Sequence, residues 1–379
     1  MIFTRALPST PLVRRAPRRR RLLGLGLHRF IATGSTPVPF KILYMGRDEF
    51  SCSVFKHLHD AKDVWQELHI ATHPDEHVGR RGSQLSVSPL KTLGQSLGVS
   101  VYEIPHAKPE FKTWPVNAAT SQATPPPSHM LLTASFGRII PQRMLAAFPP
   151  HNRLNVHPSP LPAYRGAAPI QHMLMAGERE TAVCVIEMLR KVDAGAVWGR
   201  EELAIPPDAD FATMRDLLGD VGGRLLVRVL REKMRGTASS VAQAEDVSAP
   251  RAPLIQAADA MLDFARMSAE GIVRLQRAIG HQVCHRRALD DVADEAISLH
   301  GLSVEGEAPA FLTREPGGAM LHKPGRKILV RCAGGTVLGA REAKMQDKAQ
   351  VGAVDWWNGA QSLGMVADRC VRLSRPRTV

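Results

Sequence analysis

The feature that most constrains the fold is an apolar run near residue 40 that passes through a glycine directly into a helical pattern. The run FKILYMG spans Phe40–Gly46, and apolar residues then recur at helical spacing as far as Leu58. A short buried strand followed by a helix is the repeating unit of a parallel sheet. Further strand-like runs alternate with helical stretches, at residues 66–71, 99–104 and 130–135. The alternation predicts an α/β domain with an open, doubly wound, mostly parallel sheet.

The length predicts a second domain after this sheet. A chain of 379 residues, 44% of them hydrophobic, can bury two cores. An amphipathic helix beginning at Phe211 would close the first domain, and the polar, proline-containing stretch around residues 241–253 favours a link. Beyond it, one helix and several short strands between glycine turns indicate a small β-barrel, similar to an OB fold. The predicted helix covers residues 258–278, and the clearest strands cover residues 327–332 and 336–340. We therefore predict a catalytic domain at 40–242, a linker at 243–253 and a β-barrel-like domain at 254–379.

The first 39 residues are rich in arginine and contain no acid. They hold eight arginines of a chain whose net charge is +13, and the first carboxylate is Asp48. An Arg-rich, acid-free leader with leucines and hydroxyl residues is typical of a mitochondrial transit peptide. The RFIATG segment at Arg29–Gly34 also resembles the cleavage-adjacent pattern of matrix presequences. We expect residues 1–39 to be such a peptide and the protein to lie in the mitochondrial matrix; a basic arm that binds nucleic acid is the alternative.

Cysteine usage and hydropathy exclude other classes. The five cysteines are scattered and form no CxxC pair, so a disulfide framework or a thiolate metal site is not expected. Lys, Arg or Pro interrupts the apolar runs before they reach the roughly 18 residues of a membrane span. We expect no metal and no membrane association.

The densest chemical signal is RLNVHPSPLPAYRGAAPIQ at Arg153–Gln171. In an extended segment Asn155 and His157 point to the same face. The proline-rich stretch after them must leave the sheet, and parallel-sheet enzymes bind ligands at the carboxyl ends of their strands. The pair is therefore expected at a cleft.

This motif resembles that of the folate-dependent formyltransferases, and of the methionyl-tRNA formyltransferases in particular. Further matches are FKILYMGRDEF, the loop THPDEHVGRRGSQLSVSPLK, ASFGRIIP and the later VCVIEMLRKVDAGAVW. The resemblance implies 10-formyltetrahydrofolate as co-substrate, no metal, and Asn155, His157 and Asp193 as catalytic residues. It also implies that a loop lies against the folate, formed by Ser159, Pro160, Leu161 and Pro162. Pro158, Pro160 and Ala163 depart from the family pattern in this loop.

The chemistry explains these residue types. When a neutral amine attacks a formyl carbon, an oxyanion develops, and hydrogen-bond donors must lie where that oxygen will be. Asn155 can donate through its amide and His157 through its ring, while Asp193 would orient His157 and accept the proton of the attacking nitrogen. A Ser or Cys nucleophile is not required.

The resemblance implies initiator Met-tRNA as the acceptor, and two basic regions favour tRNA. The loop Gly79–Lys91 resembles the family loop that meets the acceptor end of tRNA, and residues 320–379 hold eleven Lys or Arg against four acids. The predicted tRNA-binding residues are Arg80, Arg81, Lys91, Arg165, Arg341, Lys344 and Lys348. We expect a monomer. Two alternatives remain open: another enzyme that uses 10-formyltetrahydrofolate, such as a glycinamide ribonucleotide formyltransferase or a hydrolase, and a tRNA-binding protein without catalysis.

Overall fold

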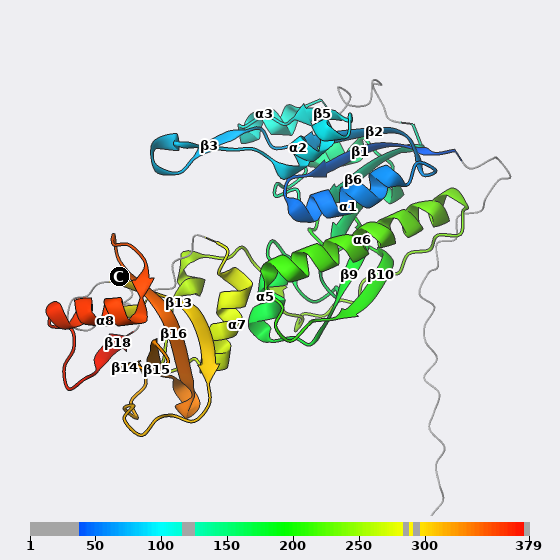
Figure 1. Ribbon diagram of the computed structural model, residues 1–379. Coiled ribbons are helices and arrows are strands. Elements are labelled where there is room, and N and C mark those ends of the chain that lie inside the picture. Colours follow the sequence, from blue (N-terminus) through cyan, green and yellow to red (C-terminus); the bar gives the residue numbers. More distant parts are fainter. Residues whose placement is uncertain (1–37, 116–125, 283–287, 291–295, 375–379) are drawn as a thin grey trace, which may run out of the picture.

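The computed structural model describes residues 38–115, 126–282, 288–290 and 296–374. The predicted transit peptide therefore lies almost wholly outside the described residues. Figure 1 shows the rest of the chain as two bodies, the first drawn from blue to green and the second from yellow to red.

The first body is built on a seven-stranded sheet in the order β10-β9-β7-β6-β1-β2-β5. Five neighbouring strands are parallel, and β9 and β10 run antiparallel to their neighbours at one edge. The strands are β1 (Phe40–Gly46), β2 (Trp65–Thr72), β5 (Ser100–Glu103), β6 (His129–Ala134), β7 (Arg153–His157), β9 (Glu180–Glu187) and β10 (Val197–Ala204). This arrangement confirms the predicted mostly parallel α/β sheet.

Helices cover both faces of this sheet. Within β1, Ile42 and Tyr44 belong to one buried cluster and Leu43 and Met45 to another, as the two-residue period of a strand requires. The first cluster lies under α1 (Glu49–Asp60), α2 (Pro89–Ser96) and α6 (Phe211–Met234), and the second under α3 (Lys108–Thr113) and α4 (Gln142–Ala146). Figure 1 shows α1 and α6 side by side. Glycines permit this approach, since a Cβ at Gly219 of α6 would lie 2.8 Å from the Ser53 Cβ of α1.

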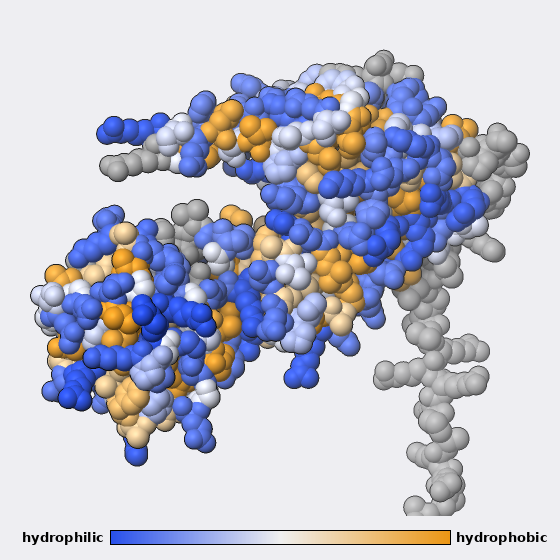
Figure 2. All heavy atoms as spheres, viewed as in Figure 1, coloured by the Kyte–Doolittle hydropathy of each residue, from blue (hydrophilic) through white to orange (hydrophobic). Residues whose placement is uncertain are grey.

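A hairpin arm leaves the carboxyl end of β2. It consists of β3 (Glu76–Val78), the 3-10 turn Arg80–Gly82 and β4 (Gln84–Ser86). Figures 1 and 2 show that the arm projects beyond the sheet and that the surface is hollowed between the arm and the second body. The carboxyl ends of the parallel strands lie on the side from which the arm emerges, because β2 is parallel to β1 and β5.

The second body is an antiparallel barrel with helices on its outside. Its strands follow the order β13-β12-β18-β14-β15-β16-β17, and pairing of β13 with β16 closes the ring. The elements are α7 (Ala269–Ile279), β12 (Ala288–Asp290), β13 (Ala296–Glu305), β14 (Gly318–His322), β15 (Lys327–Arg331), β16 (Val337–Met345), β17 (Val351–Gly352), α8 (Ala353–Ser362) and β18 (Val371–Ser374). The predicted β-barrel-like domain is confirmed. Helix α7 packs against α5 (Pro169–Ala176) of the first body.

The single helix predicted at residues 258–278 is wrong. The structure has a short 3-10 helix at Ala257–Ala260 and then α7, separated by a turn in which the backbone nitrogens of Arg266 and Met267 donate to Asp263. Ser268 then begins α7, because its hydroxyl accepts a hydrogen bond from the Gly271 nitrogen at 3.2 Å. None of the described helices combines the length and the apolar character needed to cross a membrane.

Candidate active site

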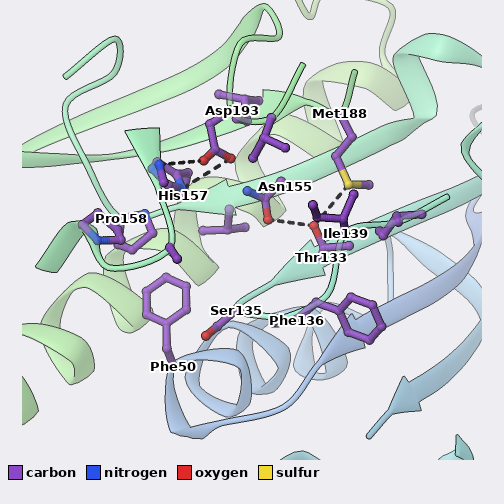
Figure 3. Close-up of a pocket in the computed structure, with 18 of the residues that line it drawn as sticks. Phe50, Thr133, Ser135, Phe136, Ile139, Asn155, His157, Pro158, Met188 and Asp193 are labelled. Atoms are coloured by element: carbon purple, nitrogen blue, oxygen red, sulfur yellow. Dashed lines mark hydrogen bonds and ion pairs between the residues drawn. The ribbon is translucent and has the colours of Figure 1, made fainter. Parts of the chain in front are cut away.

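The carboxyl end of β7 presents Asn155 and His157 to a cavity of about 500 Å³. The two side chains share one face of the strand, and Val156 between them is buried against α6 on the other face. Figure 3 shows both side chains together with Asp193, which comes from the loop between β9 and β10. The structure therefore brings together the three residues predicted to be catalytic.

Thr133 on the neighbouring strand β6 fixes the orientation of Asn155. Its hydroxyl donates to Asn155 Oδ1 at 2.7 Å and also lies 3.3 Å from Met188 Sδ. This bond fixes which end of the carboxamide is the oxygen, and it leaves the Asn155 amide nitrogen available as a donor. It bonds to no other residue in the part of the chain that the structure describes, so it can meet an oxygen in the cavity.

His157 faces two protein acceptors. Its Nε2 lies 3.2 Å from the Tyr164 carbonyl oxygen, which can only accept, so Nε2 carries a hydrogen. Its Nδ1 lies 3.7 Å from Asp193 Oδ1, and both side chains are nearly buried, at 6% and 10% exposure. Donation from His157 to a substrate oxygen would require the ring to exchange the Tyr164 carbonyl for that oxygen.

A tight turn places Asp193. The residue has a positive φ of 54°, a region that Asn and Asp tolerate better than other residues. Its Oδ2 accepts a hydrogen bond from the Gly166 nitrogen at 3.0 Å. Gly195 is required two residues later, since a Cβ there would lie 1.8 Å from the Glu187 carbonyl oxygen. The Asp193-Ala194-Gly195 sequence therefore forms a turn that holds a carboxylate beside His157.

The opposite wall of the cavity comes from the segments that follow β1 and β6. Figure 3 places Phe50 and Ser135 across from Asp193, and Asp48 lines the same side. Asp48 caps α1 by accepting a hydrogen bond from the Ser51 nitrogen at 3.1 Å, and Ser135 donates to its other oxygen. Burial raises the pKa of the Asp48 carboxyl, and these two hydrogen bonds oppose the rise.

The sequence patterns of one family match both bodies. The pattern described as formyl transferase matches residues 55–230, and the pattern for the formyl transferase C-terminal domain matches residues 254–361. The chain belongs to the formyl transferase family. It is a formyl-transferring enzyme.

Curated relatives of this formyltransferase carry the name methionyl-tRNA formyltransferase. The protein from Lactiplantibacillus plantarum is 29% identical over 319 residues, which cover 84% of this chain and 95% of that protein. The protein from Macrococcus caseolyticus is 32% identical over 230 residues, which cover 61% of this chain and 70% of that protein.

Solved structures share the fold of this formyltransferase at low identity. WlaRD, a sugar 3N-formyl transferase solved with dTDP and 5-N-formyl-THF, is 11% identical with a TM-score of 0.55, covering 82% of this chain and 100% of that one. HypX from Aquifex aeolicus in complex with tetrahydrofolic acid is 17% identical with a TM-score of 0.53, covering 86% of this chain and 47% of that one.

The predicted folate loop of this formyltransferase does not line the cavity. Ser159 is fully buried and donates to the Ala163 carbonyl at 2.9 Å, and Leu161 packs in a small core with Cys184 and Ile186. Pro160 and Pro162 also lie outside the cavity wall, which this loop reaches only through Pro158. The loop is therefore held by its own contacts, and the contact of residues 159–162 with folate stays a prediction.

Two residues predicted to bind tRNA are occupied by protein partners. Lys91 lies 2.7 Å from Asp75 and 2.6 Å from Glu103, and its side chain is 16% exposed. Hydrogen bonds to these carboxylates raise its pKa. Arg165 is buried and donates to Gln243 Oε1 from Nε at 3.0 Å and from Nη2 at 2.5 Å. Lys91 is thus paired with carboxylates beside the hairpin arm and Arg165 with the Gln243 carboxamide, and their contact with tRNA stays a prediction.

The other predicted tRNA-binding residues occupy two separate places. Arg80 and Arg81 lie at the tip of the hairpin arm, where the Arg81 side chain is exposed. In the barrel, Arg341 and Lys344 lie on β16 and Lys348 follows it; Arg341 and Lys348 are exposed and Lys344 is half-buried. The described residues contain no group of three or more His, Cys, Asp or Glu that could hold a metal ion.

Sequence reasoning missed three supports of the site. Thr133 lies within a predicted strand, but only the pairing of β6 with β7 reveals that it faces Asn155. Gly166 was noted only as part of the RGAAPIQ match, and its nitrogen proves to hold Asp193. Gln243 carried no signal, because it lies in a polar segment without periodicity.

Proposed function

We propose that this enzyme moves the formyl group of 10-formyltetrahydrofolate to the amino group of methionine on initiator Met-tRNA, for translation initiation in mitochondria. The observation that carries the reaction is the placement of Asn155, His157 and Asp193 around one cavity at the carboxyl edge of the sheet. The relatives named methionyl-tRNA formyltransferase support the acceptor, and the folate ligands of the solved neighbours support the donor.

The cavity suits a flat folate ring beside a polar reacting centre. Phe136, Ile140 and Leu145 give it an apolar wall, while Asn155 and Asp193 give it a donor and an acceptor on the facing side. Such a division, with a mostly apolar lining and a few placed polar groups, is typical of small-molecule sites.

The residues divide the chemistry between them. The amine nitrogen forms a bond to the formyl carbon, the bond from that carbon to the folate nitrogen breaks, and one proton moves from the amine to the leaving nitrogen. Asn155 donates its free amide hydrogen to the formyl oxygen as charge develops there. Asp193, directly or through water, accepts the amine proton, and His157 beside it shares the resulting charge. No side chain needs to form a covalent intermediate.

The acceptor end of tRNA has a suitable approach. The hollow between the hairpin arm and the barrel opens on the side where the strands end. Arg81 is exposed at the tip of the arm, and Arg341 and Lys348 are exposed on the barrel. Cations that contact phosphates bind in a salt-dependent manner. We infer that the arm and the barrel hold tRNA across this hollow while its aminoacyl end reaches Asn155.

An acceptor comparison tests this function. The purified chain with 10-formyltetrahydrofolate should formylate Met-tRNA and not glycinamide ribonucleotide. The opposite preference would contradict the proposed acceptor, and release of formate without transfer would indicate a hydrolase. Binding of Met-tRNA without turnover would favour the tRNA-binding protein without catalysis.

The location needs its own experiment. Residues 1–39, with their eight arginines and no acid, support import into the mitochondrial matrix. A fluorescent protein fused behind these residues should enter mitochondria and lose the leader, as mass spectrometry of its new N-terminus would show. A fusion that stays outside mitochondria would contradict the proposal.

A further inference from the structure

The segment between the two bodies runs along the loops of the active site. Val241 and Val197 exchange backbone hydrogen bonds of 2.8 and 2.9 Å, and the Tyr164 nitrogen donates to the Pro250 carbonyl at 2.6 Å. Strand β11 (Arg251–Ala252) then pairs in parallel with β8 (Arg165–Gly166). The connection is therefore bound to the catalytic domain at both of its ends.

Within residues 241–248 of this connection, Gln243 is the residue that turns inward. Its neighbours at positions 241–242 and 244–248 are exposed, whereas Gln243 is half-buried. Its amide nitrogen donates to the carbonyl oxygens of Asp193 at 2.9 Å and Gly195 at 2.8 Å. Its amide oxygen accepts both hydrogen bonds from the Arg165 guanidinium.

The contacts of Gln243 and Arg165 hold the turn that carries Asp193. Gln243 binds both ends of the Asp193-Ala194-Gly195 turn through the backbone, and Gly166, next to Arg165, binds the Asp193 carboxylate. The turn needs such support because Asp193 has a positive φ, which a free chain would seldom adopt. Position 166 itself requires glycine, since a Cβ there would lie 2.2 Å from the Ala252 carbonyl oxygen.

We propose that Gln243 and Arg165 are positioning residues that hold Asp193 at His157, and that the connection between the domains carries this clamp. Neither side chain reaches the reacting atoms, so both act through the Asp193 turn. The proposal rests on the catalytic role of Asp193 in the proposed function. It makes one stretch of chain responsible both for joining the barrel to the sheet and for placing a catalytic carboxylate.

Gln243→Glu tests the clamp with almost no change in volume. Glutamate can still pair with Arg165, but it lacks the amide hydrogens that bind the Asp193 and Gly195 carbonyls. We expect kcat for formylation by the full chain to fall by about tenfold to a hundredfold, since a displacement of about 1 Å at a reacting group costs that much. KM for Met-tRNA and for 10-formyltetrahydrofolate should change by less than about twofold, because neither residue binds substrate.

Gln256→Glu is the matched control. Gln256 lies further along the same connection, where its side chain caps the 3-10 helix Ala257–Ala260 and donates to the Leu254 carbonyl at 3.2 Å. The same chemical change at this position should leave kcat unchanged. An equal loss of kcat in both variants would overturn the proposal, because the effect would then not depend on contact with the Asp193 turn.

A double-mutant cycle separates positioning from general damage. When Asp193→Asn has removed the carboxylate, Gln243→Glu should lower the single-turnover rate by less than about twofold more, because there is no carboxylate left to place. An unchanged tenfold or greater loss in that background would overturn the proposal. So would a Gln243→Glu single variant with the kcat of the parent chain.

Substitutions of Arg165 test the same proposal independently. Arg165→Lys keeps a cation that can donate to Gln243 Oε1, and Arg165→Met keeps only the volume. We expect Arg165→Lys to retain at least about fivefold more kcat than Arg165→Met, a difference of one charge-assisted hydrogen bond. Equal activity of the two would contradict the role given to the guanidinium. These comparisons can use any acceptor that the parent chain formylates, so a failure with Met-tRNA would overturn the acceptor and leave the clamp testable.

Discussion

The end of β7 and the Asp193 turn both place side chains at the same cavity, but they do so in different ways. Asn155 and His157 are placed by a regular strand, whose two-residue period and sheet pairing fix the direction of both side chains. Asp193 is placed by a turn with a positive φ, held by residues 27 and 50 positions away along the chain. A strand carries its geometry in its own backbone, whereas a turn of this kind depends on distant partners. We therefore expect substitutions of residues distant in the chain to displace Asp193 more than they displace Asn155 or His157.

Asn155→Ala should have the largest effect, because it removes the free donor at the strand end. Loss of one oxyanion donor typically lowers kcat by about 10²- to 10³-fold. Affinity for Met-tRNA should change little, since Asn155 carries no charge that could pair with a phosphate. Steady-state kinetics with a separate measurement of tRNA affinity would check this, and a kcat within tenfold of the parent would remove Asn155 from its assigned role.

Gly195→Ala should damage the turn without altering any of the three proposed catalytic side chains. The new Cβ would meet the Glu187 carbonyl oxygen at 1.8 Å, so the turn must move and Asp193 with it. We expect a loss of about 1–3 kcal/mol in the free energy of unfolding and a tenfold or larger fall in kcat. Gly359→Ala is the control, because its Cβ would meet nothing within 4 Å in α8 and alanine favours a helix. Full activity of Gly195→Ala would show that the turn is less constrained than the strand end.

Thr133→Val probes the support of the strand end at a smaller scale. Valine keeps the shape of threonine but cannot donate to Asn155 Oδ1, so the carboxamide loses the contact that orients it. One such hydrogen bond is worth about 1 kcal/mol, which corresponds to roughly a fivefold fall in kcat. Thr133→Ser retains the hydroxyl and should stay near the parent rate; equal losses in both would point to packing instead.

Replacing Lys233, which contacts the segment before β7, should have the smallest effect on kcat. Its ammonium lies 3.2 Å from the Trp198 ring centroid and donates to the His151 carbonyl at 2.8 Å. Burial lowers the pKa of Lys233 to about 7, although Glu187 opposes the shift. The unfolded chain keeps this proton up to about pH 10, so folding releases it between pH 7 and 10 and stability rises with pH there.

In Lys233→Met this rise should be absent. Unfolding measured between pH 7 and 10 would show it as a difference in slope of up to about 1.4 kcal/mol per pH unit between the two proteins. A parallel pH dependence in both would contradict the lowered pKa. The kcat of this variant at pH 7 should match the parent, because β7 keeps its sheet pairing.

The sequence allowed the strand end to be predicted and not the supports of the turn. Strand periodicity put Asn155 and His157 on one face, and the alternating pattern placed that face at the carboxyl edge of a parallel sheet. The motif match then brought in Asp193, for which local sequence gives only a turn. Gln243 could not be predicted, because its partners are defined by tertiary contacts across 50 residues. For the same reason the protein partners of Lys91 and Arg165 could not be predicted, because Asp75, Glu103 and Gln243 meet these cations only in the folded chain.

The contacts of the connection also decide where this protein can be cut and rejoined. Composition marks residues 243–253 as a linker, and the two family patterns leave residues 231–253 unmatched between them. A chimaera that exchanged barrels at residue 240 would discard Gln243 and β11 with the old barrel, and the recipient sheet would lose its hold on Asp193. A junction after Ala252 would carry these residues with the sheet. Recombination between relatives should therefore succeed more often beyond β11 than within the stretch that composition suggests.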